Sequence, residues 1–72
     1  MGEVIKMSLS DNLRALRKQK GYSQEQLAER LNVSRQAVSK WENGASDPST
    51  SNLLALAKLY GISAEDLLKE VE

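Results

Sequence analysis

Two short apolar repeats within residues 23–43 constrain the fold of this chain more than any other feature. In the first repeat, Leu27 and Leu31 lie four positions apart, so they project from the same face of a helix. In the second repeat, Val38 and Trp41 lie three positions apart and share a face in the same way. Because both apolar faces need to be buried, we predict two short helices that contribute to one core.

The residues between the two repeats predict a tight turn. Asparagine tolerates a left-handed backbone, so Asn32 can end the first of these helices. The hydroxyl of Ser34 can accept hydrogen bonds from the exposed amides that open the next helix. Ala28 lies just before the turn, where its small side chain lets two steeply crossing helices approach closely, and Val33 faces inward. Helix, short turn and helix, with a small residue at the crossing, predict a helix-turn-helix motif.

The outer face of the second helix of this motif is polar and basic: Arg35, Gln36, Ser39 and Lys40. Arginine, glutamine and lysine side chains can bind base edges in the major groove of DNA, and lysine also binds phosphates. The alternative interpretation is a solvated polar face, which any surface helix has. We favour base reading because these residues begin at the start of the second helix, where helix-turn-helix proteins place their recognition side chains.

The remaining residues predict helices on both sides of the motif. Ser10 is the expected N-cap of a first helix, with Leu9 packing ahead of it, and Gly21 ends that helix. After the motif, Asp47 and Pro48 have the pattern of an N-cap followed by the first helical residue, which predicts the start of a fourth helix.

Capping patterns and glycines set the other helix ends. Residues 23–26 read S-x-x-Q, a capping box that opens the second helix, and Gly44 ends the third. The fourth helix has one apolar face: Leu53, Leu56, Ala57 and Tyr60. Gly61 ends it, and the S-x-x-D pattern of residues 63–66 opens a fifth helix. We expect Trp41 to be a core residue rather than a base-stacking platform.

Length and composition limit the possible functions. The 72 residues predict one compact all-α domain of five helices over residues 9–72, preceded by a flexible arm at residues 1–8. Without cysteine or histidine the chain has no disulfide, thiolate metal site or histidine chemistry, and no catalytic constellation can be drawn. We therefore expect neither an enzyme nor a metal or cofactor site. The apolar stretch of residues 53–57 is too short for a membrane span, so we expect a soluble cytoplasmic protein.

Charge is distributed unevenly along a chain whose formal net charge is zero. Residues 1–44 carry eight Lys and Arg against five Asp and Glu, a net charge of +3, whereas residues 45–72 carry −3. The zero total argues against a polycation that coats nucleic acid. The basic first part and the acidic second part instead suit a protein that presents one end to phosphates.

The order and spacing of these motifs resemble the Cro/lambda-repressor-type (Xre-like) helix-turn-helix family. The resemblance covers about residues 9–70 and rests on LRALRKQKGYSQEQLAERLNVSRQAVSKWENG, then LLALAKLYGIS, then EDLL. It implies a five-helix all-α fold whose third helix enters the major groove of double-stranded DNA. It also implies a homodimer that binds a palindromic operator.

The resemblance implies roles for individual residues by their position in the motif. Gln24 would clamp a phosphate or support the recognition side chains. The implied base-reading residues are Arg35, Gln36 and Lys40. The implied phosphate contacts are Ser39 and Asn43, with Ser23 and the Arg17 region behind them. Arg17 and Glu42 match a structural ion pair between the first helix and the end of the third, so we keep this pair out of the base-reading set.

Two departures from the family pattern lie after the recognition helix. The loop ASDPSTS has no Lys or Arg, and its Asp47 would repel phosphate. Thr50 occupies a position that relatives usually fill with an apolar residue, which predicts thinner packing at the start of the fourth helix. Both departures predict a weaker nonspecific affinity for DNA than that of a strongly basic relative.

Three functions are considered on the sequence alone, and the residues give no support to one of them, an enzyme or ligand-sensing protein; the other two remain open. The first is a sequence-specific regulator of transcription, preferably a repressor. The alternative is a protein-interaction module of the same fold, such as an antitoxin or adaptor, for which the acidic C-terminal end would capture a partner. Tyr60, Leu68 and Val71 either form an apolar dimer surface or close the core. We expect Tyr22 and Tyr60 to be packing residues whose hydroxyls reach the surface.

Overall fold

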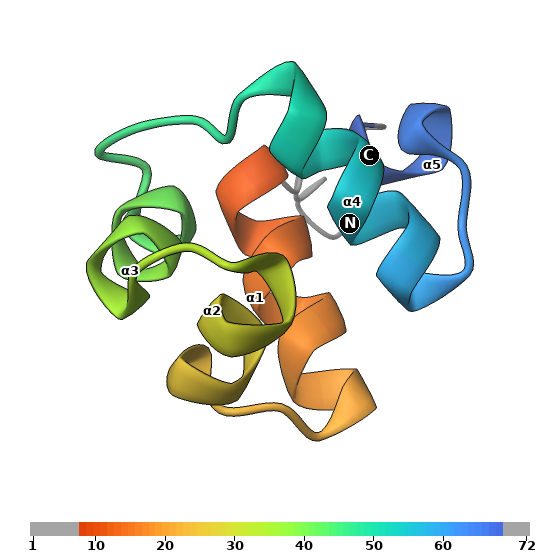
Figure 1. Ribbon diagram of the computed structural model, residues 1–72. Helices are drawn as coiled ribbons and strands as arrows, with labels where there is room; N and C mark the ends of the chain where they lie inside the picture. Colours follow the sequence, from red (N-terminus) through yellow and green to blue (C-terminus); the bar gives the residue numbers. More distant parts are fainter. Residues whose placement is uncertain (1–7, 69–72) are drawn as a thin grey trace, which may run out of the picture.

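Residues 8–68 of the computed structural model form five α-helices and, within that range, no strand (Figure 1). The helices in chain order are α1 (Leu9–Lys20), α2 (Gln24–Leu31), α3 (Arg35–Asn43), α4 (Thr50–Tyr60) and α5 (Ala64–Leu68). The all-α, five-helix prediction is confirmed. Only residues 8–68 are described, so nearly all of the predicted arm lies outside them, as does Val71. None of the described helices is long and apolar enough to cross a membrane.

The helix-turn-helix begins and turns where the sequence indicates. The hydroxyl of Ser23 accepts from the amide of Gln26 at 3.0 Å, and the side chain of Gln26 accepts from the Ser23 amide at 2.8 Å. Asn32 ends α2 with a φ of +59°, in the left-handed region. The hydroxyl of Ser34 accepts from the amide of Ala37 at 3.1 Å and opens α3. These local signals therefore set where α2 begins, where it ends and where α3 begins.

The predicted N-cap of α1 is wrong by two residues. Ser8, not Ser10, caps the helix, because its hydroxyl accepts from the Asp11 amide at 3.3 Å. The carboxylate of Asp11 accepts in return from the Ser8 amide at 3.4 Å. Three residues after Ser10 stands Leu13, whose side chain accepts no hydrogen bond, so the reciprocal capping box forms at Ser8.

The predicted start of α4 is also wrong by two residues. Ser49 is the N-cap, and its hydroxyl accepts from the Asn52 amide at 3.2 Å, so the helix begins at Thr50. Pro48 is buried in the incoming loop rather than placed in the first helical turn. The helix therefore starts after Pro48, at the next residue with a hydroxyl that can cap it.

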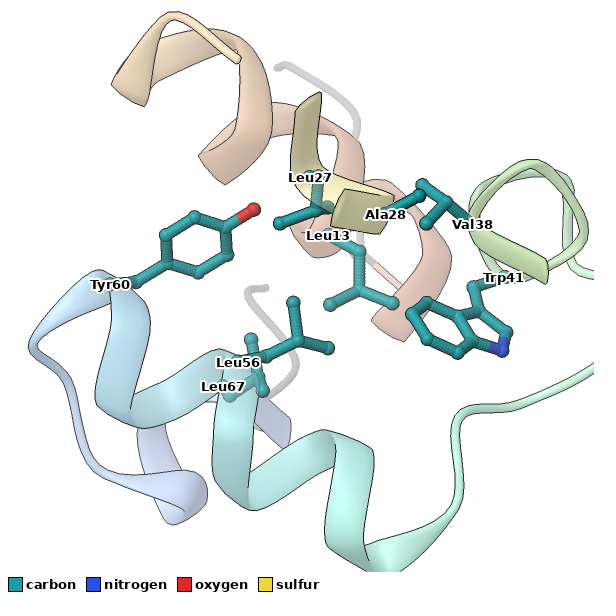
Figure 2. Packing of buried hydrophobic residues seen from close by; sticks show 8 residues of the cluster. All are labelled: Leu13, Leu27, Ala28, Val38, Trp41, Leu56, Tyr60 and Leu67. Carbon is teal, nitrogen blue, oxygen red and sulfur yellow. The ribbon is translucent and has the colours of Figure 1, made fainter. Parts of the chain in front are cut away.

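One apolar core joins all five helices, as Figure 2 shows. Its buried members are Leu13, Leu27, Ala28, Val38, Trp41, Leu56, Tyr60 and Leu67. Trp41 is 6% exposed, which confirms its place in the core. Ala28 is 3% exposed and faces Val38 where α2 packs against α3, as the small residue at the crossing predicts. Each buried leucine contributes about 1.5–3 kcal/mol relative to an exposed one, and α3 takes part in this cluster through Val38 and Trp41.

The two tyrosines occupy different environments. Tyr22 is half-buried and packs against the core. Tyr60 is 3% exposed, and its ring points from α4 toward Leu27 of α2 in Figure 2. The prediction that its hydroxyl reaches the surface is wrong: the hydroxyl is buried and has no hydrogen-bond partner among the described residues. Burial raises the pKa of Tyr60 to about 12, with a smaller contribution from Glu42.

Candidate nucleic-acid interface

The side of α3 that faces away from the core presents polar and basic side chains to solvent. Arg35, Gln36 and Lys40 are exposed, and Ser39 is half-buried. Together these four residues line an open hollow of about 320 Å³. The inward side of the same helix carries Val38, which is 1% exposed. The core therefore holds α3 by one side while the other side remains available for binding.

The exposed face of α3 combines charge with directed hydrogen-bonding groups. The guanidinium of Arg35 offers a planar set of donors, and the amide of Gln36 offers donors and an acceptor. These are the groups that pair with guanine and adenine edges in the major groove. The first turn of α3 contains no acidic residue, so no neighbour within it neutralises Arg35. Base edges and phosphates are suitable ligands for such a face.

Behind this face, a buried ion pair attaches the end of α3 to α1. Glu42 is 4% exposed, and its Oε2 accepts from Nε of Arg17 at 2.6 Å. Nη2 of Arg17 donates to Oε1 of Glu42 at 3.1 Å, and Nη1 donates to the carbonyl of Tyr22 at 2.8 Å. The hydrogen bond to Glu42 raises the pKa of Arg17. The ion pair implied by the family resemblance is present, and it supports the exposed face rather than belonging to it.

The other residues implied as DNA contacts lie at the start of α2 or at the end of α3, and each has a structural partner. Nε2 of Gln24 donates to Oε1 of Glu42 at 3.1 Å, which joins α2 to the ion pair. The exposed Ser23 caps α2 with its hydroxyl. The exposed Asn43 accepts from the amide of Ala45 at 2.9 Å and so closes the end of α3. Each of these side chains retains a further hydrogen-bonding group that a phosphate can engage.

A second hollow of about 200 Å³ lies next to the first, between α1, α2 and α3. Its lining consists of Arg14, Arg17, Lys18, Gln24, Ser39, Glu42 and Asn43. Ser39 lines both hollows, so the two adjoin. Sequence reasoning missed Arg14 and Lys18, although their spacing of four positions places them on one face of α1. That spacing could have identified a basic stripe beside the recognition helix.

Comparison with known proteins identifies relatives over nearly all of the described chain. A family model described as Helix-turn-helix matches residues 13–67. Over 66 residues the chain is 41% identical to the HTH-type transcriptional activator BcrR of Enterococcus faecalis, covering 92% of this chain and 32% of BcrR. It is 39% identical over 66 residues to the HTH-type transcriptional regulator ImmR of Bacillus subtilis, covering 92% and 52% respectively. The chain therefore spans about a third of BcrR and about half of ImmR.

The fold also matches a solved repressor domain. The crystal structure of the c2 repressor protein of Salmonella phage P22, in complex with a synthetic operator, has a TM-score of 0.80 at 37% identity. The match covers 86% of this chain and 94% of that chain. The motif, the five-helix fold and these matches together show that the chain belongs to the helix-turn-helix family of the Cro/lambda-repressor (Xre-like) type.

Proposed function

We propose that this protein is a sequence-specific regulator of transcription, a repressor, that binds double-stranded DNA and reads the major groove with α3. The observation that carries this proposal is the exposed basic face of α3, opposite a side that the core fixes in place. The proposed base-reading residues are Arg35, Gln36 and Lys40, all of them exposed. In support, relatives of this chain are named as transcriptional regulators, and the P22 c2 repressor structure includes an operator.

Phosphate contacts complete the proposed interface on the side of α3 that faces α1 and α2. We assign them to four residues: Ser23, Gln24, Ser39 and Asn43. Their support is their position at the second hollow or at the start of α2, whose free amides favour an anion. The DNA-binding domain extends over residues 9–72 in this proposal. Phosphate contacts position the protein on the duplex, whereas the α3 side chains select the sequence.

The protein is further proposed to act in the cytoplasm, on nucleoid DNA, as a homodimer on a palindromic operator. In that arrangement the two α3 helices lie about 34 Å apart, one turn of the duplex. Of the residues considered for the dimer surface, Leu68 is 48% exposed and remains a candidate, whereas Tyr60 is buried. The antitoxin or adaptor alternative is not favoured, because the relatives BcrR and ImmR are named as regulators of transcription.

Selection from a pool of random duplexes tests this proposal. The purified protein is used for several rounds of enrichment, and the selected duplex and a scrambled duplex are then titrated at two salt concentrations. We expect an enriched palindrome whose half-sites are about 10 base pairs apart and whose affinity falls steeply with salt. Weak binding without any enriched sequence would contradict the proposal and favour the interaction module.

A further inference from the structure

The C-terminal end of α3 is attached to α1 through its backbone as well as through a side chain. Arg17 and Gln24 donate to the carboxylate of Glu42, as described above. Arg14, one turn before Arg17 on α1, donates from Nη2 to the backbone carbonyl of Glu42 at 2.9 Å. This contact joins α1 to the main chain of the recognition helix, so it constrains the helix itself and not only one of its side chains.

The carbonyl that Arg14 binds belongs to the last turn of α3, where helix geometry leaves carbonyls without an intrahelical donor. The backbone amides that follow the helix bond to a different carbonyl, two residues before Glu42: those of Gly44, Ala45 and Ser46 all donate to the carbonyl of Lys40. Arg14 therefore supplies, from another helix, the donor for the carbonyl of Glu42. The positive guanidinium is also favourable at the negative end of the α3 dipole.

Because the contact between Arg14 and Glu42 lies at the end of α3, it affects the tilt of the helix and so the position of the base-reading side chains. The buried Val38 and Trp41 hold α3 by apolar contacts, which are not directional and resist separation more than tilting. Arg35 lies seven residues from Glu42, about 10 Å along the helix axis. A tilt of about 5° around the end at Glu42 therefore moves Arg35 by about 1 Å. A displacement of about 1 Å disturbs a bidentate contact between a side chain and a base edge, whereas a flexible side chain can still reach a phosphate after the same displacement.

From this geometry we propose that Arg14 is a positioning residue, which sets the tilt of α3 and thereby the selectivity of base reading. The inference rests on the proposed function above and assigns Arg14 a role in it. Arg14 acts through the backbone of Glu42 and touches no base. Its removal is expected to weaken binding to the selected operator while binding to unrelated DNA is retained.

Lys18 provides a matched control for the charge of Arg14. It lies one turn further along α1, is exposed and lines the same hollow. Its side chain makes no hydrogen bond or ion pair with the residues from 8 to 68. Arg14→Met and Lys18→Met each remove one positive charge from this hollow and keep an unbranched side chain. Only Arg14→Met removes the contact with α3.

The experiment measures the affinity ratio of the selected operator to a scrambled duplex, at two salt concentrations, for the full chain and its variants. For Arg14→Met we expect the ratio to fall on the order of tenfold, with a loss of scrambled-duplex affinity no greater than that of Lys18→Met, which removes the same charge from the same hollow. Arg14→Lys keeps a shorter donor, so an intermediate ratio is expected. Lys18→Met should leave the ratio unchanged, because the loss of a charge that does not contact α3 weakens binding to both duplexes alike.

Two results would overturn the inference while the proposed function stands. Arg14→Met with the parent's ratio would show that α3 keeps its tilt without Arg14. A parallel loss of affinity for both duplexes, with a reduced salt slope, would make Arg14 a phosphate contact instead. If thermal melting shows that Arg14→Met is unfolded, Arg14→Lys decides, and a ratio equal to that of the parent then contradicts the inference. A parent without any discrimination would overturn the proposed function itself.

Discussion

The hydroxyl of Tyr60 is a polar group buried in an apolar core. The side chain is 3% exposed, and the hydroxyl has no hydrogen-bond partner among the described residues. Leaving a buried hydroxyl unpaired costs about 1–3 kcal/mol. The ring nevertheless fills space between α4 and α2, so the shape of the residue is useful to the core while its hydroxyl is not.

Tyr60→Phe is therefore expected to stabilise the fold by about 1 kcal/mol, since it keeps the ring and removes the unpaired hydroxyl. Urea unfolding followed by far-ultraviolet circular dichroism measures the change in the free energy of unfolding. A loss of stability of similar size would contradict this expectation, because it would show that the hydroxyl makes a favourable hydrogen bond in the folded protein.

The same hydroxyl gives stability a specific dependence on alkaline pH. In the folded protein the pKa of Tyr60 is raised to about 12, compared with 10.0 for an unperturbed tyrosine. Between these values the unfolded chain loses the phenolic proton while the folded chain keeps it. The contribution of the protonated Tyr60 to the free energy of unfolding is therefore complete below pH 10. As the pH rises toward 12, the free energy of unfolding declines by up to about 1.4 kcal/mol per pH unit. The measurement compares the free energy of unfolding of the parent and of Tyr60→Phe between pH 10 and pH 12. An equal decline in both proteins would contradict the expected dependence on Tyr60.

At the scale of helices, most ends follow from local sequence and two do not. Ser23, Ser34 and Asn32 are in the predicted roles because a side chain and a backbone amide within a few residues decide each one. The starts of α1 and α4 were each mispredicted by two residues. Several serines stand near each start, and the choice between them depends on partners further along the helix or, at Pro48, on burial in the assembled fold.

The left-handed residue between α2 and α3 provides a test of the turn. Asn32 has a φ of +59°, where an alanine is strained and a glycine is not. Asn32→Ala should reduce the free energy of unfolding by about 1 kcal/mol, whereas Asn32→Gly should stay within a few tenths of the parent. Chemical denaturation of both variants measures the difference. Equal stability of the alanine and glycine variants would be inconsistent with a left-handed turn at this residue.

The ion pair between α1 and α3 is tested by removing one partner and then both. Arg17→Leu leaves the carboxylate of Glu42 buried, with Gln24 still donating to it, and should cost roughly 3 kcal/mol. The double variant Arg17→Leu/Glu42→Leu removes both charges and should recover most of that loss. Thermal and urea unfolding of the parent and both variants measure this. If the double variant is as unstable as the single one, the loss comes from packing and not from an unpaired charge.

At the scale of the whole molecule, the sequence predicted the recognition face better than its surroundings. Arg35 and Lys40 belong to one short helix, so the helical period is enough to place them on its outer side. The second hollow combines three helices, and its Arg14 lies 28 residues from Glu42 along the chain. A contact between residues so far apart in the chain depends on how α1 crosses α3, and the helical periodicity of the sequence does not predict that crossing. The burial of the Tyr60 hydroxyl was not predicted for the same reason, since it depends on how α4 packs against α2.

The most direct test of base reading by α3 compares selected DNA sites between the parent and Arg35→Ala. Arg35 is exposed at the start of α3, so its removal should leave the fold intact and cost roughly 1–3 kcal/mol in operator binding. Both proteins select from the same pool of random duplexes. We predict that Arg35→Ala loses base preference at a single base-pair position in each half-site and keeps the preference at the others. An unchanged selected site, with equal operator affinity, would contradict the claim that this face of α3 reads DNA.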